Sequence, residues 1–267
     1  MSEERYVLAT GAEGAERLKV VQGVHGADTA DFFRRLGSLQ GKRIVDIGCG
    51  IGSISCWLAE EVGEAGEVVG IDQSEGQIEQ ARQRAESLGL KNVQFHVATA
   101  YETGLERESF DIAYARFVLM HLREPNTALT EMMALLKPGG TLAVEDGDFS
   151  SLGTYPASRV FDRAVELYRK AGEAQGEHFE IGKYLHQLVI TAGAHNVQAR
   201  LVQPAYLSGI EKRLPSWTVE EATPFLTQAG IASQEEITEI LGEGRRLEED
   251  ETVLFFMARM TQVWGVK

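Results

Sequence analysis

The amino-acid sequence predicts an α/β fold in which a largely parallel β-sheet is covered by helices on both faces. Between about Gly41 and Glu145, short β-branched runs alternate with longer amphipathic stretches, which is the pattern of strand–helix–strand units with right-handed crossovers. The chain has 267 residues, of which 43% are hydrophobic and 25% charged, as in an ordinary soluble globular protein. This length suffices for a substantial core, so we expect one large domain that needs no disulfide or structural metal.

Five apolar runs are expected to form the buried strands of this sheet. In chain order they cover residues 42–48, 67–72, 93–98, 110–115 and 140–146. The segments ISCWLAEEV, QIEQARQRAESLG and NTALTEMMALL lie between them and carry apolar residues at three- and four-residue spacing, which predicts helices. Gly89 and the pair Gly139–Gly140 stand where two of these helices should end.

The flanking segments are expected to be mostly helical. Helices are predicted within residues 13–37, 157–172, 179–193 and 211–250, and strands in HNVQARLVQPAY and near residues 252–260. No linker rich in Pro, Gly or Ser separates these segments from the centre, so we interpret them as additions to one domain.

Charge and cysteine content narrow the function classes. The chain has 26 Lys and Arg against 40 Asp and Glu, a net charge of −14, which disfavours nucleic-acid and anionic membrane partners. The N-terminal MSEERYVLATG lacks the apolar core of a secretory signal, and no apolar run approaches the roughly 20 residues of a membrane span. The only cysteines are Cys49 and Cys56, which form no disulfide framework. We therefore expect a soluble, cytoplasmic protein.

A glycine-rich turn follows the first predicted strand. In VDIGCGIGS (45–53), three alternating glycines allow a ligand to approach the backbone, and the next helix offers unpaired N–H groups. Asp72 ends the second predicted strand, 24 residues after Gly48, as does the acid that binds ribose hydroxyls in dinucleotide sites. Alone, Asp72 is equally well explained as an acid at a helix N-terminus. Together with the glycine turn, it favours a nucleoside ligand.

Four segments together resemble the class I S-adenosylmethionine-dependent methyltransferases. They are VDIGCGIGS, GIDQSEGQIEQAR, FDIAYARFVLMHL and LLKPGGTLAVED, which occur in the order and spacing of that family over residues 41–150. The resemblance is greatest to the branch of quinone-biosynthesis and small-molecule methyltransferases. A nicotinamide site would favour G-x-G-x-x-G, whereas this turn reads G-x-G-x-G followed by Ser53.

The resemblance implies a Rossmann-like, seven-stranded, mostly parallel sheet with helices on both faces and a helical lid. The final strand, near 252–260, would insert antiparallel. The single domain would then comprise an N-terminal helical cover (1–40), a cofactor-binding core (41–150), and lid helices with closing strands (151–267).

The resemblance also implies a cofactor site for S-adenosyl-L-methionine. Asp46 would lie near the amino-acid end of the cofactor and Asp72 would hold its ribose hydroxyls. Ala98-Thr99-Ala100 replaces the Gly-Asp-Ala common in the family, which leaves the Thr99 hydroxyl to meet the adenine. The complete set of expected cofactor-binding residues is Tyr6, Asp46, Gly48, Gly50, Asp72, Gln73, Gln77, Thr99, Ala100 and Arg116.

Transfer of an activated methyl group requires positioning, desolvation and, for some acceptors, removal of a proton. His121 is the candidate base, with packing or helix capping as its structural alternative. Asp146, with its neighbours Glu145 and Asp148, follows the fifth strand and is a candidate for binding an acceptor amine or hydroxyl. No second cluster has metal-ligand spacing, so no metal is expected.

The sequence therefore predicts methyl transfer from S-adenosylmethionine to a small, partly apolar acceptor. Two alternatives remain: a cofactor-binding regulatory or scaffold protein, and a non-methylating enzyme that uses the sulfonium electrostatically. Six aromatic residues in the flanking helices are candidates for an apolar pocket or for the core: Phe161, Tyr168, Phe179, Tyr184, Trp217 and Phe225. These helices would also suit a homodimer contact.

Overall fold

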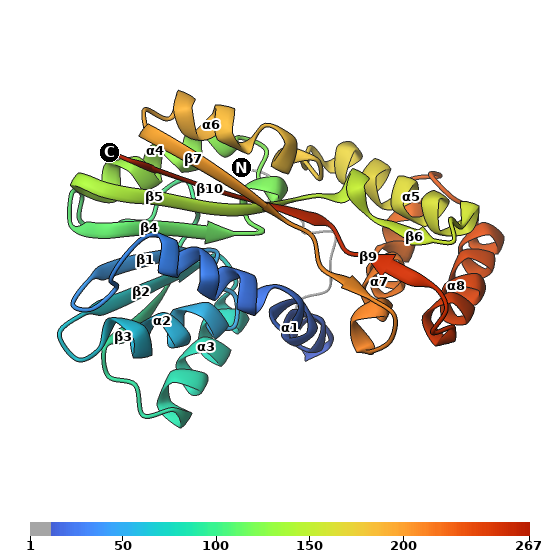
Figure 1. Cartoon of the computed structure of the whole chain (residues 1–267), viewed down its shortest axis with the longest axis horizontal. Helices are drawn as coiled ribbons and strands as arrows, with labels where there is room; N and C mark the ends of the chain where they lie inside the picture. Colours follow the sequence, from blue (N-terminus) through green and yellow to red (C-terminus); the bar gives the residue numbers. More distant parts are fainter. Residues whose placement is uncertain (1–11) are drawn as a thin grey trace.

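The computed structural model describes residues 12–267 and contains a seven-stranded sheet with the strand order β3-β2-β1-β4-β5-β10-β7 (Figure 1). The first five strands in the chain are parallel: β1 (Arg43–Ile47), β2 (Glu67–Asp72), β3 (Val93–Val97), β4 (Phe110–Arg116) and β5 (Leu136–Asp148). β10 (Arg259–Val266) pairs antiparallel with both β5 and β7 (His195–Val202). The predicted Rossmann-like, mostly parallel seven-stranded sheet is confirmed.

Helices cover both faces of this sheet because its strands are apolar on both sides. Ile44 of β1 packs with residues of α1 (Ala12–Arg35) and α2 (Ser53–Val62), whereas its neighbour Val45 packs on the opposite face with α4 (Pro125–Leu135). This alternation is the two-residue period of a strand. α3 (Glu75–Ser87) packs beside α2, and α6 (Leu185–Thr191) lies on the face of α4 (Figure 1).

The position predicted for the final strand was wrong. Residues 254–256 form β9, the middle strand of a separate three-stranded sheet with β6 (Gly153–Tyr155) and β8 (Ala205–Tyr206). The strand inserted into the main sheet begins only at Arg259. The apolar run that suggested a sheet strand instead packs in the helical part of the molecule, where Phe255 meets Phe161 edge-to-face.

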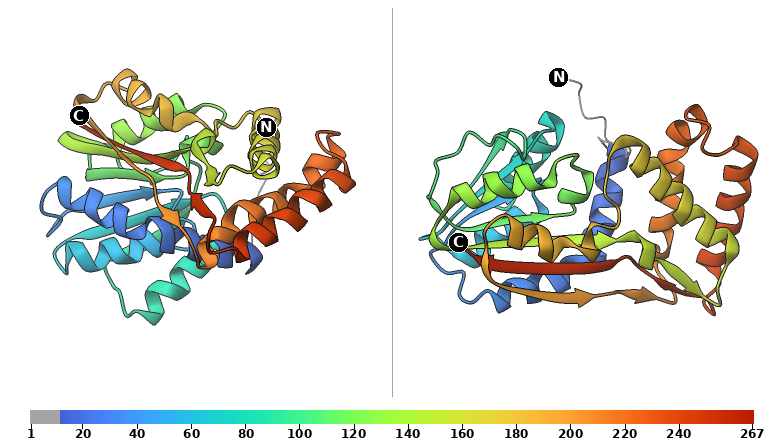
Figure 2. Two further views of the ribbon diagram at one scale, coloured as in Figure 1. Left: turned by 45° about the vertical axis from the view of Figure 1, so that its right-hand side comes forward. Right: turned by 90° about the horizontal axis from the view of Figure 1, so that it is seen from above.

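A helical lobe stands beside the carboxyl ends of the parallel strands (Figure 2). It consists of α5 (Arg159–Gln175), α7 (Leu214–Gln228) and α8 (Gln234–Glu249), whose apolar faces pack together in one cluster. The predicted stretches 157–172 and 211–250 form these helices. The stretch 179–193 contains a short 3-10 turn, Ile181–Lys183, followed by α6.

α1 crosses between the sheet and the helical lobe (Figure 1). It continues unbroken through Gly23 and Gly26, and polar contacts on each side hold it in place. Arg116, at the end of β4, donates to the Gln22 side chain at 2.7 Å and to the Thr29 hydroxyl at 3.0 Å. Arg17 forms an ion pair with Glu221 of α7 at 3.2 Å. α1 therefore links the two parts of the molecule.

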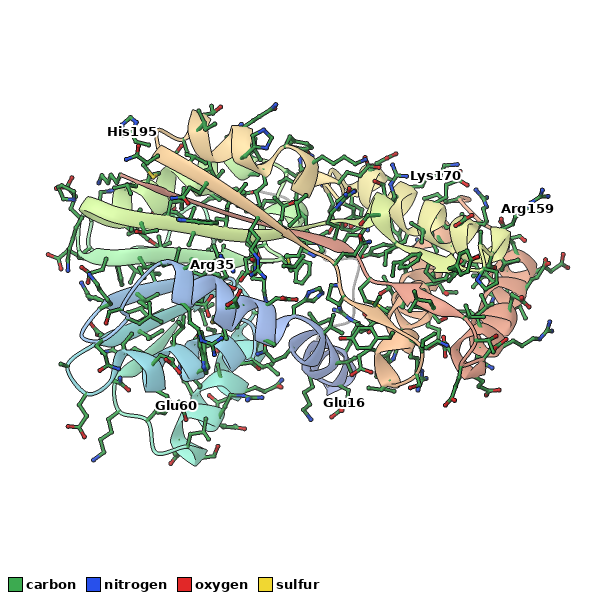
Figure 3. All side chains as sticks on the ribbon, viewed as in Figure 1. Glu16, Arg35, Glu60, Arg159, Lys170 and His195 are labelled. Carbon is green, nitrogen blue, oxygen red and sulfur yellow. The ribbon has the colours of Figure 1, made fainter. Side chains whose placement is uncertain are left out.

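Charged side chains lie around the periphery, among them Glu60 and Lys170, and His195 also lies there, far from the centre of the molecule (Figure 3). Within residues 12–267, no helix is both long enough and apolar enough to cross a membrane.

Candidate functional site

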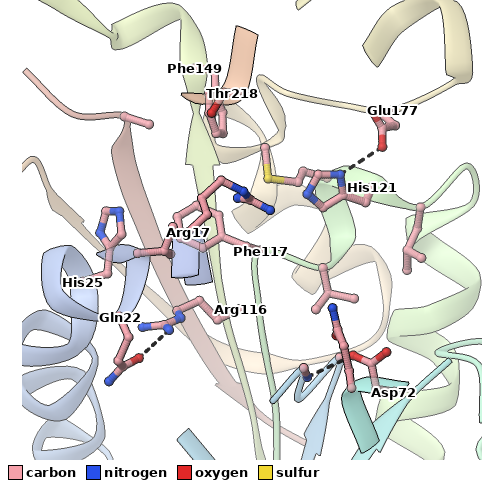
Figure 4. A pocket seen from close by; sticks show the side chains of 18 of the residues that line it. Arg17, Gln22, His25, Asp72, Arg116, Phe117, His121, Phe149, Glu177 and Thr218 are labelled. Atoms are coloured by element: carbon pink, nitrogen blue, oxygen red, sulfur yellow. Dashed lines mark hydrogen bonds and ion pairs between the residues drawn. The ribbon is translucent and has the colours of Figure 1, made fainter. Parts of the chain in front are cut away.

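A cavity of about 310 Å³ lies where the carboxyl ends of β1, β2 and β4 meet α1 and the helical lobe (Figure 4). The strand order reverses at β1, which has β2 on one side and β4 on the other. In open α/β sheets, ligands bind outside the strand ends at such a switch point. The fold therefore places the cavity at the expected edge of the sheet.

The glycine turn after β1 forms one wall of the cavity. Gly48, Gly50 and Gly52 have φ angles of 69°, 54° and 72°, in the left-handed region that glycine adopts without strain. A Cβ atom at Gly48 would lie 2.3 Å from Cγ2 of Val118. Gly48 is thus required by the turn and by its packing, and both Gly48 and Gly50 line the cavity.

Asp72 connects this turn to the start of α3. Its Oδ2 accepts a hydrogen bond from the Gly50 N–H at 2.9 Å, and its Oδ1 accepts from the Ser74 N–H at 2.9 Å. Burial raises the pKa of Asp72, against the lowering effect of these hydrogen bonds. Ser74, not Asp72, caps the helix, and Gln73 and Gln77 line the cavity next to Asp72.

Asp46 is a buried carboxyl group on the floor of the cavity. Burial raises its pKa to about 7, against the opposing effects of a 2.6 Å hydrogen bond from the Ser55 hydroxyl and of the nearby Arg116. A buried acid favours a cationic neighbour, which would restore its charge. Arg116 also lines the cavity, while its guanidinium binds α1.

One of the predicted cofactor contacts, Thr99, is not found in the cavity wall. Ala98 and Ala100 line it, but the Thr99 hydroxyl turns away and accepts a hydrogen bond from the Glu102 N–H at 3.1 Å. This contact caps the loop after β3, which explains why the side chain does not face the ligand space. Tyr6 lies outside the described residues.

Asp146 does not line the cavity either, because its buried carboxyl faces the backbone of the loop after β4. Its carboxyl accepts hydrogen bonds from the backbone N–H groups of Met120 and Gly147, both at 3.3 Å, and burial raises its pKa to about 8. Glu145 binds the Tyr114 hydroxyl at 2.6 Å, and Asp148 caps the turn that follows β5. These three acids thus bind groups within the fold: Asp146 holds the loop after β4, Glu145 binds side chains of β4 and β10, and Asp148 holds the turn after β5.

His121 lines the cavity from a 3-10 turn after β4. Its Nδ1 lies 3.0 Å from Oε1 of Glu177, and the two side chains are 10% and 5% exposed. The ring of Phe179 meets the imidazole edge-to-face, with centroids 5.5 Å apart. Glu177 was not predicted from the sequence, because it lies 56 residues from His121 in the loop after α5, without a recognisable motif.

The far side of the cavity is apolar and aromatic, with Phe117, Phe149 and Tyr168 in its wall. Tyr168 stacks on Phe179 at a centroid distance of 4.4 Å, so Phe179 supports the wall from behind. Of the six aromatic residues considered from sequence, only Tyr168 lines the cavity. Arg17 and His25 of α1 line it too and were also missed, although their eight-residue spacing with Val21 between them marks one helix face.

Residues 12–267 contain no group of three or more His, Cys, Asp or Glu side chains arranged to hold a metal ion. The described part of the site combines the glycine turn bound to Asp72, one His–Glu pair and one aromatic wall.

Known proteins resemble this chain in sequence and in fold. The family model described as "Methyltransferase domain" matches residues 38–229. A demethylmenaquinone methyltransferase of Lactococcus lactis is 32% identical over 146 residues, which cover 55% of this chain and 56% of the relative. The O-methyltransferase rstn1 of Aspergillus nomiae is 34% identical over 160 residues, or 60% of this chain and 68% of the relative. This chain thus spans about half the length of the first of these relatives.

Among solved structures, a SAM-dependent methyltransferase from Aquifex aeolicus superimposes with a TM-score of 0.52 at 23% identity. The match covers 70% of this chain and 91% of that structure. At this identity the likeness concerns the fold.

Proposed function

The chain belongs to the class I S-adenosylmethionine-dependent methyltransferase family, and we propose that it transfers a methyl group from S-adenosylmethionine to a small-molecule acceptor. One observation carries the proposal most strongly. Asp72 and the glycine turn are joined by a hydrogen bond in the wall of a cavity at the switch point of the sheet. This is where a nucleoside cofactor would bind in such a fold.

The residues present fit this cofactor. Asp72 offers a carboxylate for the ribose hydroxyls, and buried Asp46 offers an acid that a cationic ligand would keep ionised. The proposed contacts are Asp46, Gly48, Gly50, Asp72, Gln73, Gln77, Ala100 and Arg116. When bound, the cofactor supplies a methyl group that its sulfonium already activates. The protein then has to align the acceptor and exclude water.

His121 is proposed to remove a proton from an acceptor hydroxyl or amine. Glu177 accepts from Nδ1–H of the imidazole, which fixes the tautomer and directs Nε2 into the pocket (Figure 4). Nε2 then takes the acceptor proton as the new bond to the methyl carbon forms. Glu177 stabilises the resulting imidazolium and acts as the positioning residue.

The acceptor is proposed to be a partly apolar, ring-containing molecule. The aromatic wall of Phe117, Phe149 and Tyr168 supports this, since flat rings stack on such side chains. The printed names of two relatives, a demethylmenaquinone methyltransferase and an O-methyltransferase, agree with a small acceptor. The net charge of −14 disfavours nucleic acid.

Residues 1–40 are proposed as the cover of the site, 41–150 as the cofactor-binding core, and 151–267 as the lid with its closing strands.

A cytoplasmic location is supported by the two thiols of Cys49 and Cys56, which are both buried and free. A homodimer through the helical lobe stays a prediction.

Isothermal titration of the chain with S-adenosylmethionine and with S-adenosylhomocysteine tests the proposal. We expect saturable binding of both at one site. If neither binds, the proposed function is wrong.

A further inference from the structure

One face of α1 forms a wall of the cavity that the proposed cofactor contacts do not use. Arg17, Val21, Gln22 and His25 follow one another at spacings of four, one and three residues, so their side chains share one side of the helix. In Figure 4, Arg17 and His25 stand on the side of the pocket away from Asp72. The molecule that contacts this wall would therefore be the acceptor.

Arg17 is a buried cation whose orientation is fixed. The residue is 8% exposed, and its Nε donates to Oε2 of Glu221 on α7 at 3.2 Å. Among the described residues, this hydrogen bond uses one of the five guanidinium N–H groups, and the four on the two Nη atoms are directed elsewhere. The end of the side chain reaches above Phe117 into the middle of the pocket (Figure 4). A guanidinium held in this way is pre-organised for an oxygen anion.

His25 is a buried histidine with an unsatisfied ring nitrogen. It is 5% exposed, and within residues 12–267 its Nδ1 has no hydrogen-bond partner. Burial and the nearby Arg116 lower its pKa to about 3, so the imidazole is neutral and offers one donor and one acceptor. A buried polar atom without a partner destabilises the fold, and a bound polar ligand removes that cost.

Phe117 connects these polar groups to the aromatic wall. Its φ of 54° lies in the left-handed region, which is strained for an aromatic residue, and its N–H is fixed to the Glu145 carbonyl at 2.9 Å. The ring of His25 meets that of Phe117 edge-to-face at 5.1 Å. A flat ligand on the aromatic wall would thus have its edge near His25 and Arg17.

We propose that Arg17 and His25 form the recognition site for an acidic oxygen of the acceptor, a carboxylate or an acidic ring hydroxyl. This inference rests on the proposed function and deepens it, because it assigns the acceptor a chemical class. The aromatic wall holds the ring, Arg17 and His25 hold the oxygen, and the cofactor occupies the opposite half of the cavity. A neutral molecule of the same shape would give the guanidinium no second anion beside Glu221, so its hydrogen bonds to Arg17 would lack the charge of the acceptor.

Two probes of one shape test this assignment: 2-naphthoate, which carries a carboxylate, and 2-naphthamide, which does not. Their affinities are measured with the chain saturated with S-adenosylhomocysteine, and again without it. We expect the wild-type chain to prefer 2-naphthoate by about 10- to 100-fold, the value of one or two charge-assisted hydrogen bonds.

The variants are His25→Phe and the double variant Arg17→Met with Glu221→Gln, which leaves no buried carboxylate unpaired. Both should lose most of the preference. Lys19→Met removes an exposed cation from the same helix and should keep it. Thermal unfolding shows whether each variant folds, and His25→Phe alone decides the matter if the double variant does not.

Equal binding of the two probes to the wild-type chain, or binding of neither, would overturn the inference. A loss of S-adenosylhomocysteine affinity in His25→Phe that matches its loss of 2-naphthoate affinity would also overturn it, since His25 would then serve the cofactor. If the wild-type chain prefers 2-naphthoate yet does not bind S-adenosylhomocysteine, the proposed function fails and the oxygen site stands.

Discussion

Replacing Asp72 should weaken cofactor binding, in addition to any loss of stability from its two hydrogen bonds to backbone N–H groups. In the proposed complex, this carboxylate accepts two hydrogen bonds from the ribose. Each hydrogen bond to an ionised acceptor contributes about 1.5–3 kcal/mol, so Asp72→Ala should cost at least about 3 kcal/mol of binding free energy. At about 1.4 kcal/mol per factor of ten, the dissociation constant for S-adenosylhomocysteine should rise by at least about 100-fold.

Asp72→Asn gives an intermediate case. The amide keeps one acceptor oxygen for the Gly50 or Ser74 N–H but loses the charge, so we expect a rise of about 10-fold. Glu75→Gln is the matched control, because it removes an exposed acid from the first turn of the same helix. Isothermal titration measures each dissociation constant, and thermal unfolding measures each melting temperature.

In a second interpretation, Asp72 only stabilises the start of α3 and does not contact the cofactor. That interpretation predicts a lower melting temperature for Asp72→Ala and an unchanged dissociation constant. This pair of results would refute the ribose contact.

Three further predictions concern the base, a buried acid and the core. With an identified acceptor, His121→Gln should lower kcat by about 10²- to 10⁴-fold and Glu177→Gln by a smaller factor, without changing cofactor affinity in titrations; an unchanged kcat contradicts the base assignment. Burial raises the pKa of Asp146 to about 8, so the native state keeps a proton that the unfolded chain releases above about pH 4. This carboxyl therefore lowers the free energy of unfolding as the pH rises from about 4 to 8, by at most about 1.4 kcal/mol per pH unit. As the pH rises from 5 to 8, the free energy of unfolding of Asp146→Asn should increase relative to that of the wild type, as measured by urea unfolding. A difference between the two that does not change with pH would contradict this. Gly70→Ala should destabilise the fold by about 1–3 kcal/mol, because its Cβ would lie 2.6 Å from a ring carbon of Phe95. Gly76→Ala, in open space on α3, should not destabilise it. Equal effects of the two variants in denaturant unfolding would exclude the packing explanation.

The central sheet was predictable because its signals are local. Apolar strands, amphipathic helices and the glycine turn each lie within a few consecutive residues. Because strands and helices alternate along the chain, β1 to β5 could be predicted to run parallel. The last strand was misplaced because Leu254–Phe256 is more apolar than Arg259–Val266. The inserted strand carries the buried Gln262, whose side chain donates to Glu145 at 2.7 Å and to the Asp28 carbonyl at 3.1 Å. Both contacts join distant parts of the sequence, so the sequence does not show why a polar residue stands there.

The two halves of the candidate site also differ in how far the sequence predicts them. The cofactor half follows one strand-loop-helix motif, so Asp46, Gly48 and Asp72 could be named from sequence. The acceptor half gathers residues from α1, α5, α7 and the loops after β4 and β5, with no fixed spacing between them. Glu177 was missed because only the fold brings it to His121, and Asp146 was misassigned because its backbone partners are visible only in the folded loop.

The most direct test of methyl transfer is a mass measurement on a metabolite extract incubated with the chain and S-adenosylmethionine that carries a ¹³CD₃ methyl group. We predict one labelled product and an equal amount of S-adenosylhomocysteine, with much less of both formed by Asp72→Ala when the cofactor does not saturate the variant. Cofactor binding without any labelled product would contradict transfer and indicate a regulatory or scaffold protein. A new product without label or cofactor consumption would contradict it too, and would indicate an enzyme that uses the sulfonium only electrostatically.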